Sequence, residues 1–380
     1  MVWVKRNPGD STFQVVDWVR TAAIIPVLAS HASGTVFFGS DAASFIWKEI
    51  GRNNLYGVTL FFVVSGFLIT RVLARGPGGL FQPDLRHFYA RRMGRILPLL
   101  FLFVLIGVAI LLYGQAHIPG SHLNPRYHGF WFWFCIATFS FNWYEVAVNS
   151  QWFGLHWMVL WSLAVEEQFY VFYPWFLRWL GRTRNFVIFL AVIFIMGPVF
   201  RGWAAVAHPE NYWLEAISTF GVVDQLAVGC FLYVAWERLR SDLERMFWPR
   251  WILTILGGVT MFLVFTRTNH YDRVDMIWAP TLVAVGCFFF LLGGLSITWF
   301  ELRGGWILTL PGKYSYGNYL LHTTVLFFMY SFLLSKPAIW AFPLYLAVAT
   351  AVAALSFHLY EYPLNLWIRR HLDPAHSKRL

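Results

Sequence analysis

Residues 55–74 read LYGVTLFFVVSGFLITRVLA, a run of twenty residues in which Arg71 is the only charged side chain. A helix of twenty residues is about 30 Å long, which matches the thickness of the hydrocarbon core of a bilayer. The run therefore predicts a membrane-spanning helix. Together with nine similar runs it gives ten expected spans, at roughly 13–31, 55–74, 95–115, 154–179, 186–203, 216–236, 251–267, 277–299, 314–334 and 339–360.

The composition of the whole chain agrees with lipid as its main solvent. Of the 380 residues, 58% are hydrophobic, 20% are aromatic and only 13% are charged. A soluble domain of this length carries about a quarter charged residues. No long hydrophilic stretch remains in which a second domain could fold. We therefore expect one membrane domain over residues 1–380 and no separate soluble domain.

An eleventh segment, near 129–148, is rich in aromatic residues, and the arginines decide whether it crosses. Cytoplasmic loops carry an excess of Lys and Arg. Basic clusters near 71–95, 178–184, 238–250 and 369–370 fall on the inner side together only if this segment does not cross. We predict an all-α polytopic membrane protein with about ten transmembrane helices, both termini cytoplasmic, and a re-entrant or interfacial segment near 129–148. Because irregular backbone at membrane depth needs protein or water beside it, we expect this segment to roof a site.

Several other classes of partner are disfavoured. The formal net charge is +10, but the basic residues lie beside apolar segments and not on an aromatic–basic platform, so we expect no nucleic-acid partner. The three cysteines lie inside apolar segments without paired spacing, and the loop histidines near 117–128 show no ligand-like spacing. We therefore expect no disulfide framework and no bound metal.

Ionisable residues inside the first span are candidates for function, because each costs a few kcal/mol to insert. Asp17 and Arg20 are three residues apart, which predicts an ion pair on one helix face. His31 follows Arg20 by eleven residues, about three turns, so it shares that face about 16 Å further along. A purely structural ion pair and an interfacial histidine are the alternatives. The shared stripe favours function.

Two further clusters carry charge into the membrane region. Glu166 and Glu167 are neighbours in one span and project about 100° apart, so we expect one to face the bundle interior and the other to pair with a basic residue. Arg92 and Arg95 are three residues apart at the expected cytoplasmic start of the third span, so they share a helix face. Their guanidinium groups suit phosphate oxygens. A structural role for the glutamates and a topological role for the arginines are the alternatives. His322, inside 314–334, is an intramembrane polar residue with a structural alternative.

Five blocks of sequence, taken in order, resemble the motifs of a known family. They are Asp17–Arg20 with His31, FFVVSGFLIT at 61–70, RRMGRILP at 91–98, WSLAVEEQFY at 161–170, and YGNYLLH at 316–322 with EYP at 361–363. Together they resemble the acyltransferase-3 family of integral membrane O-acyltransferases over nearly the whole chain. Trp18 and Thr21 stand where that family usually has glycines.

The resemblance implies an enzyme, an O-acetyltransferase, in a bacterial cytoplasmic membrane. Its donor would be cytoplasmic acyl-CoA, acetyl-CoA above all, as co-substrate with no tightly bound cofactor. Its acceptor would be a hydroxyl of an extracytoplasmic carbohydrate or lipid-linked glycan. A channel beside the first helix would carry the pantetheine arm of the donor. The length of that arm is of the same order as the separation between Arg20 and His31.

Roles for individual residues follow from this hypothesis. His31 acts as general base, and an acyl-histidine intermediate is the less favoured alternative. Arg20 stabilises charge along the channel, with Asp17 fixing its rotamer. Glu167, with Glu166 as the less favoured alternative, orients the imidazole or the acceptor. The expected acyl-CoA-binding residues are Arg91, Arg92, Arg95 and Ser65, and the expected acceptor or pocket residues are Trp161, Ser162, Glu166 and His322.

A second hypothesis comes from another class of protein, a transporter or flippase for a lipid-linked sugar. Ten helices with intramembrane charges suit such a path, but no internal repeat of the kind many transporters have is visible. A transporter does not release free coenzyme A, so that release separates the two. A purely structural membrane subunit leaves the stripe of Asp17, Arg20 and His31 without a purpose.

Overall fold

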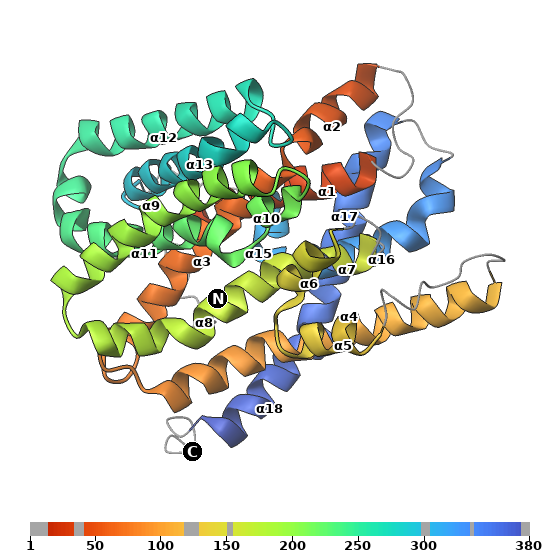
Figure 1. Ribbon diagram of the computed structural model, residues 1–380, viewed down its shortest axis with the longest axis horizontal. Coiled ribbons are helices and arrows are strands. Elements are labelled where there is room, and N and C mark those ends of the chain that lie inside the picture. The colour runs from red at the N-terminus through yellow and green to blue at the C-terminus, as the bar shows by residue number, and fades with distance from the viewer. Residues whose placement is uncertain are drawn as a thin grey trace.

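The structure is a computed structural model that describes residues 14–33, 42–117, 129–149, 155–297, 305–334 and 338–373, and its regular elements are all helices (Figure 1). The prediction of an all-α polytopic protein is confirmed. The expected positions of the two chain termini lie outside the described residues. The long helices are α1 (Gln14–Ser33), α3 (Asn54–Arg75), α4 (Leu85–His117), α8 (Leu160–Leu180), α9 (Thr183–Ala207), α11 (Thr219–Arg245), α12 (Phe247–Arg267), α13 (Arg273–Gly294), α16 (Ser315–Leu334) and α17 (Ala338–Ser356).

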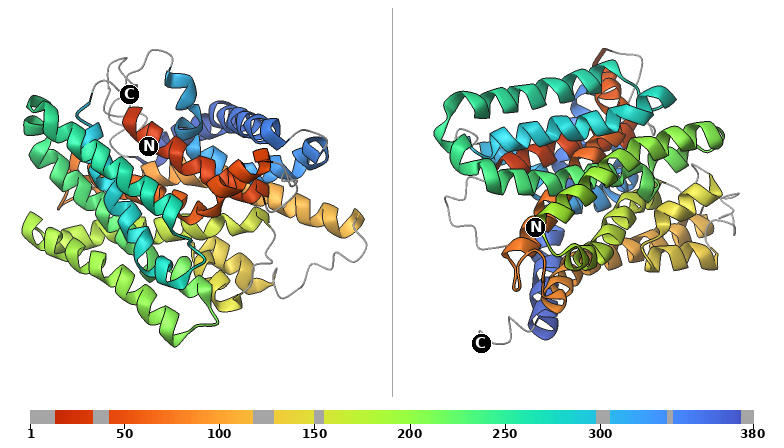
Figure 2. Two further views of the ribbon diagram at one scale, coloured as in Figure 1. Left: turned by 90° about the horizontal axis from the view of Figure 1, so that it is seen from above. Right: turned by 60° about the vertical axis from the view of Figure 1, so that its left-hand side comes forward.

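Shorter helices connect and cover these. They are α2 (Ala42–Arg52), α5 (Phe130–Ala137), α6 (Phe141–Val148), α7 (Leu155–Met158), α10 (Tyr212–Ala216), α14 (Gly305–Leu308), α15 (Leu310–Lys313), the π-helical turn η3 (Phe357–Glu361) and α18 (Tyr362–Leu372). Helices α12 and α13 lie on one side of the bundle and α4 with α18 on the other, with α3 between them (Figures 1 and 2).

Within the described ranges, eight helices are long and apolar enough to cross a bilayer. The ten predicted spans each coincide with a helix, but α8 and α16 are not among those eight. In α8 the consecutive polar residues Glu166, Glu167 and Gln168 lower the hydropathy of an otherwise apolar helix. The count of ten therefore stays a prediction.

The segment near 129–148 is broken into two helices. Helices α5 and α6 have eight residues each, about 12 Å apiece, so neither is long enough to cross a bilayer. Between them Phe139 adopts a left-handed backbone with φ of 53°, which is strained for a bulky residue. Gln168 of α8 holds this break, because its Nε2 donates to the carbonyl oxygen of Phe139 at 2.7 Å. The irregular backbone agrees with the predicted re-entrant or interfacial character.

The predicted basic clusters converge on one end of the bundle. Arg178 at the end of α8 donates to the carbonyl oxygen of Pro83 at 2.6 Å. Arg75 at the end of α3 approaches Glu237 of α11 at 3.5 Å. His87 near the start of α4 contacts Asp373, just after α18, at 2.7 Å. One end therefore gathers the arginine-rich connections, as the positive-inside rule requires of a cytoplasmic face.

Helices α3 and α11 approach so closely that glycine is required at the crossing. A Cβ atom at Gly229 would overlap the carbonyl oxygen of Val63, and one at Gly66 would overlap that of Leu226. These overlaps are with backbone, which cannot turn away as a flexible side chain can. Small residues at membrane helix crossings serve this purpose in general.

We expect Gly229→Ala to lower the free energy of unfolding by about 1–3 kcal/mol, the usual cost of overpacking. Gly202→Ala on α9 is the matched control, since its new Cβ would meet only the Cγ2 atom of Ile277 at 4.0 Å. Thermal unfolding in detergent measures both. Equal midpoints for the two variants would contradict the close approach of α3 and α11.

Candidate active site

A cavity of about 90 Å³ lies inside the bundle where α1, α3, α4, α8 and α16 meet. Seven of the predicted site residues line it and bring three basic and two acidic residues together. They are Arg20, Ser65, Arg92, Arg95, Ser162, Glu166 and Glu167. None of its lining residues belongs to the segment near 129–148, so the expectation that this segment roofs the site is not met at this cavity.

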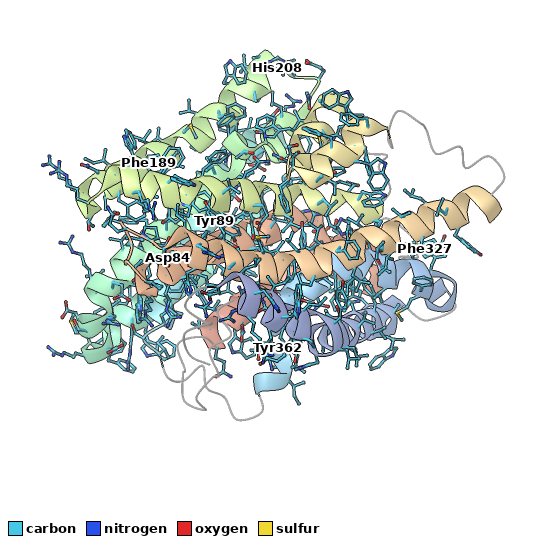
Figure 3. The ribbon with its side chains drawn as sticks, turned by 90° about the horizontal axis from the view of Figure 1, so that it is seen from below. Asp84, Tyr89, Phe189, His208, Phe327 and Tyr362 are labelled. Carbon is cyan, nitrogen blue, oxygen red and sulfur yellow. The ribbon has the colours of Figure 1, made fainter. Side chains whose placement is uncertain are left out.

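Helix α4 supplies two arginines from its first turns. Its start is fixed by Asp84, whose Oδ1 accepts the backbone N–H of His87 at 3.1 Å, a helix N-terminal cap. Further along, Tyr89 donates to the carbonyl oxygen of Val171 of α8 at 2.7 Å and ties the two helices together (Figure 3). The guanidinium groups of Arg92 and Arg95 are therefore held beside α8 and α16.

Both of these arginines stack on tyrosine rings. The Cζ atom of Arg92 lies 4.1 Å from the ring centre of Tyr170, and that of Arg95 lies 5.4 Å from the ring centre of Tyr316. Such cation–π contacts hold a guanidinium plane while leaving its N–H donors available at the edges. Arg91 is outside the cavity lining, and its Nη1 lies 3.1 Å from Nε2 of His87.

The two adjacent glutamates of α8 line the same cavity. The carboxylate of Glu166 accepts hydrogen bonds from Ser65 and Tyr170, each at 2.9 Å. We expected one glutamate to pair with a basic residue, whereas among the described residues the hydrogen-bond partners of Glu166 are hydroxyl groups. We also expected only one glutamate to face the interior. Both reach the cavity because it extends around more than 100° of α8, from Ser162 to Glu167.

The predicted ion pair of α1 is present, with Arg20 Nη1 3.9 Å from Asp17 Oδ1. Arg20 lines the cavity, whereas Asp17 lies outside the lining and is buried. Thr21, the next residue along α1, packs against Gly312 of α15. Its hydroxyl accepts the backbone N–H of Gly312 at 3.0 Å. This contact docks α15 against α1 and helps to fix the height of Arg20 in the bundle.

His31 lies beyond the cavity, near the far end of α1. Its Nδ1 is 2.7 Å from Nε2 of His322 on α16, so two residues that were assigned to separate roles form one pair. Tyr319 lies between the cavity and this pair, since it lines the cavity and its ring centre is 6.2 Å from that of His322. Ser162 donates to the hydroxyl of Tyr319 at 2.6 Å.

Trp161 is buried outside the cavity lining, with its ring centre 6.0 Å from that of Phe62. Three tyrosines that were given no site role do line it: Tyr170, Tyr316 and Tyr319. Their spacing carried a usable signal. Tyr170 follows Glu166 by one helical turn, and Tyr319 precedes His322 by one turn, so each shares a face with a predicted site residue.

No metal centre is found among the described residues, since no three His, Cys, Asp or Glu side chains there converge as ligands. The polar lining instead leaves atoms for an organic ligand. Within the described part of the chain, Arg20 Nη1 and Glu167 Oε1 are buried without a hydrogen-bond partner. Buried polar atoms of this kind call for a partner from solvent or from a ligand.

Comparison with known proteins relates this chain to a protein family and to several bacterial proteins. The sequence model of a family described as an acyltransferase domain matches residues 13–358. The chain is similar to the peptidoglycan O-acetyltransferase OatA of Listeria monocytogenes, at 26% identity over 92% of this chain and 55% of that protein. It is also similar to the putative peptidoglycan O-acetyltransferase YrhL of Bacillus subtilis, at 26% identity over 92% of this chain and 54% of that protein.

A putative O-acetyltransferase of Staphylococcus aureus (strain COL) is 24% identical over 92% of this chain and 57% of its own length. The chain therefore spans about half the length of the curated relatives it matches. No solved structure matches it. Since the family match covers nearly all of the described helices, the chain belongs to the acyltransferase-3 family of integral membrane O-acyltransferases.

Proposed function

We propose that this protein moves an acetyl group from cytoplasmic acetyl-CoA to a hydroxyl of a carbohydrate, or of a lipid-linked glycan, on the outer side of a bacterial cytoplasmic membrane. The observation that carries the proposal is the cavity in which α4 and α1 place three arginines, with His31 further along α1 and in contact with His322 of α16. The names of the relatives in Listeria and Bacillus favour a peptidoglycan-like glycan as acceptor.

The arginine end of the cavity suits the phosphates of the donor. Guanidinium groups bind phosphate oxygens through paired, charge-assisted hydrogen bonds. A volume of about 90 Å³ is enough for several water molecules, and we expect it to take the slender pantetheine chain of the donor. The adenine nucleotide would remain at the basic end, with Arg92 and Arg95 on its phosphates and the pantetheine arm directed inward past Ser65.

The reaction itself needs a base at the far end. His31 takes the proton of the acceptor hydroxyl as its oxygen attacks the thioester carbonyl carbon. The carbon–oxygen bond forms and the carbon–sulfur bond breaks, so the electron pair leaves on sulfur. The imidazolium then returns its proton to the thiolate, which departs as free coenzyme A. Glu166 and Glu167 orient groups in the cavity and take no part in this proton balance.

Release of coenzyme A tests the proposal. The purified protein in lipid nanodiscs would be given acetyl-CoA and a panel of acceptors that includes peptidoglycan fragments, and free thiol would be followed. We expect release that depends on the acceptor. A transporter for a lipid-linked sugar has no reason to release coenzyme A, so a chain that fails to bind acetyl-CoA at all would contradict acyl transfer and favour that alternative.

The arginines give a sharper prediction about the donor. In Arg92→Ala/Arg95→Ala we expect the KM for acetyl-CoA to rise by about 100-fold or more, because each charge-assisted hydrogen bond contributes about 1.5–3 kcal/mol. The KM for S-acetyl-pantetheine, which has no nucleotide phosphates, should stay the same in the variant and the wild type.

Arg86→Ala is the matched control, because Arg86 is on the same helix and exposed. It removes one positive charge, against two in the double variant, from the same end of the bundle, and it does not alter the cavity lining. If its KM for acetyl-CoA rose as much as that of the double variant, the effect would be a general one of surface charge and the assignment of Arg92 and Arg95 would fail.

A further inference from the structure

The histidine pair contains enough hydrogen bonds to assign its protons. His322 is fully buried on α16. Its Nδ1 lies 3.0 Å from the carbonyl oxygen of Asn318 and 2.8 Å from that of Tyr319. A carbonyl oxygen can only accept, and a buried ring nitrogen facing two of them is stable only if it carries the hydrogen. His322 therefore has its proton on Nδ1 and its lone pair on Nε2.

The lone pair of His322 in turn fixes the proton of His31. Nε2 of His322 is 2.7 Å from Nδ1 of His31, a distance that requires one hydrogen between the two atoms. The rings are inclined by only 19°, with their centres 4.9 Å apart, so the contact joins two ring edges. Since His322 supplies the lone pair, Nδ1 of His31 supplies the hydrogen. The lone pair of His31 then lies on Nε2.

We propose that His322 is a positioning residue that holds His31 in the Nδ1–H tautomer, so that Nε2 is the atom that takes the proton of the acceptor hydroxyl. This inference rests on the proposed function of His31 as the base. When Nε2 gains the proton, His31 becomes an imidazolium and still donates Nδ1–H to the neutral His322. The Nε2 proton then passes to the thiolate of coenzyme A, which restores the starting tautomer.

A second histidine suits this task in a membrane better than a carboxylate. Uncoupled from the pair, a histidine in water places its proton mainly on Nε2, where it would block the lone pair. An aspartate at position 322 would hold the needed tautomer, as in serine proteases, but would bury a charge among apolar helices. A neutral imidazole accepts the same hydrogen bond without that charge. The backbone at His322 is also held, because Tyr345 donates to its carbonyl oxygen at 3.0 Å.

Nitrogen NMR of the full protein in nanodiscs measures the tautomer directly. The chain has 12 histidines, so the His31 signals in ¹⁵N-histidine-labelled protein would be assigned by their loss in His31→Ala. In the wild type we expect Nδ1 of His31 to carry the proton and Nε2 of His31 to be unprotonated. We expect the Nε2–H form to dominate in His322→Leu, and the Nδ1–H form to persist in His322→Gln, whose side-chain oxygen can accept in place of Nε2.

Kinetics of the same variants supply the second readout. A wrong tautomer lowers kcat by about 10⁴-fold in a serine protease triad, and we expect a loss of about 100-fold or more here in His322→Leu. The KM for acetyl-CoA should be unchanged, and His322→Gln should recover at least about tenfold of the loss. A purely structural role for His322 would change stability without moving the His31 tautomer.

The outcomes separate the two proposals. An active wild type whose His31 carries its proton on Nε2, or a His322→Leu variant that keeps the Nδ1–H form, would overturn the role of His322 and leave acyl transfer standing. A wild type with the Nδ1–H form but without acceptor-dependent release of coenzyme A would overturn the proposed function instead. If His322→Leu does not fold, the wild-type spectrum and His322→Gln still decide.

Discussion

His31→Ala is expected to lower acceptor-dependent release of coenzyme A by about 10²–10⁴-fold, the usual contribution of a general base. Binding of acetyl-CoA should stay within about twofold of the wild type, because sites without shared contacts are independent to within about 0.5 kcal/mol. The reason is geometric, because His31 lies outside the lining of the arginine cavity and its truncation leaves the predicted phosphate site intact. Rates from thiol release and affinities from calorimetry in nanodiscs give the two quantities.

His208→Ala is the matched control for that experiment. His208 is a partly exposed histidine directly after α9, 3.7 Å from Glu210, and it is visible at the edge of the molecule in Figure 3. Its truncation should leave both the rate and the affinity unchanged. Full transfer activity in His31→Ala would remove His31 from the chemistry and with it the mechanism derived above.

The second large effect is expected on stability, at an ion pair between helices α9 and α11. Arg201 and Asp224 are fully buried, and two parallel contacts join them, Nη1 to Oδ1 at 3.1 Å and Nη2 to Oδ2 at 3.2 Å. Thr281 of α13 donates to Asp224 at 2.6 Å. Three helices thus meet at one satisfied charge pair, which is the condition under which a buried ion pair is tolerated.

Asp224→Ala should lower the free energy of unfolding by about 3–5 kcal/mol, because it leaves the guanidinium of Arg201 buried without its counter-ion. Chemical or thermal unfolding in detergent micelles measures the change. Arg201→Leu/Asp224→Leu should be more stable than Asp224→Ala, since removing both partners leaves no unpaired charge. Unfolding of Asp224→Ala at the wild-type midpoint would show that the pair does not hold the three helices together.

The fold class and much of the cavity were predictable because both depend on short-range patterns. Spans follow from runs of apolar residues, and the i, i+3 spacing of Asp17 and Arg20 fixes a shared face whatever surrounds the helix. The Arg92 and Arg95 pair follows from the same rule. Their arrival in one cavity with Glu166 was implied only by the family resemblance, because nothing in the local sequence states which helices touch.

The parts that sequence did not predict depend on the register between distant helices. His31 and His322 are 291 positions apart, so their contact is set by the heights at which α1 and α16 pack. Arg201 was not singled out, and its partner Asp224 was visible only as a polar residue in an apolar run. The glutamates differed from expectation for a related reason, since the width of a cavity is a property of several helices and not of one.

Tyr319 separates the arginine cavity from the His31–His322 pair, and this position matters for the electrical tightness of the membrane. A path open to water from the arginine cavity to the outer side would let protons and small ions leak down the electrochemical gradient of the cell. The ring of Tyr319, in edge contact with that of Phe61 at 6.0 Å between centres, fills the space next to His322. In the proposed function the donor's acetyl-bearing arm would pass this aromatic layer to reach His31, and the layer would limit the leak when no donor is bound.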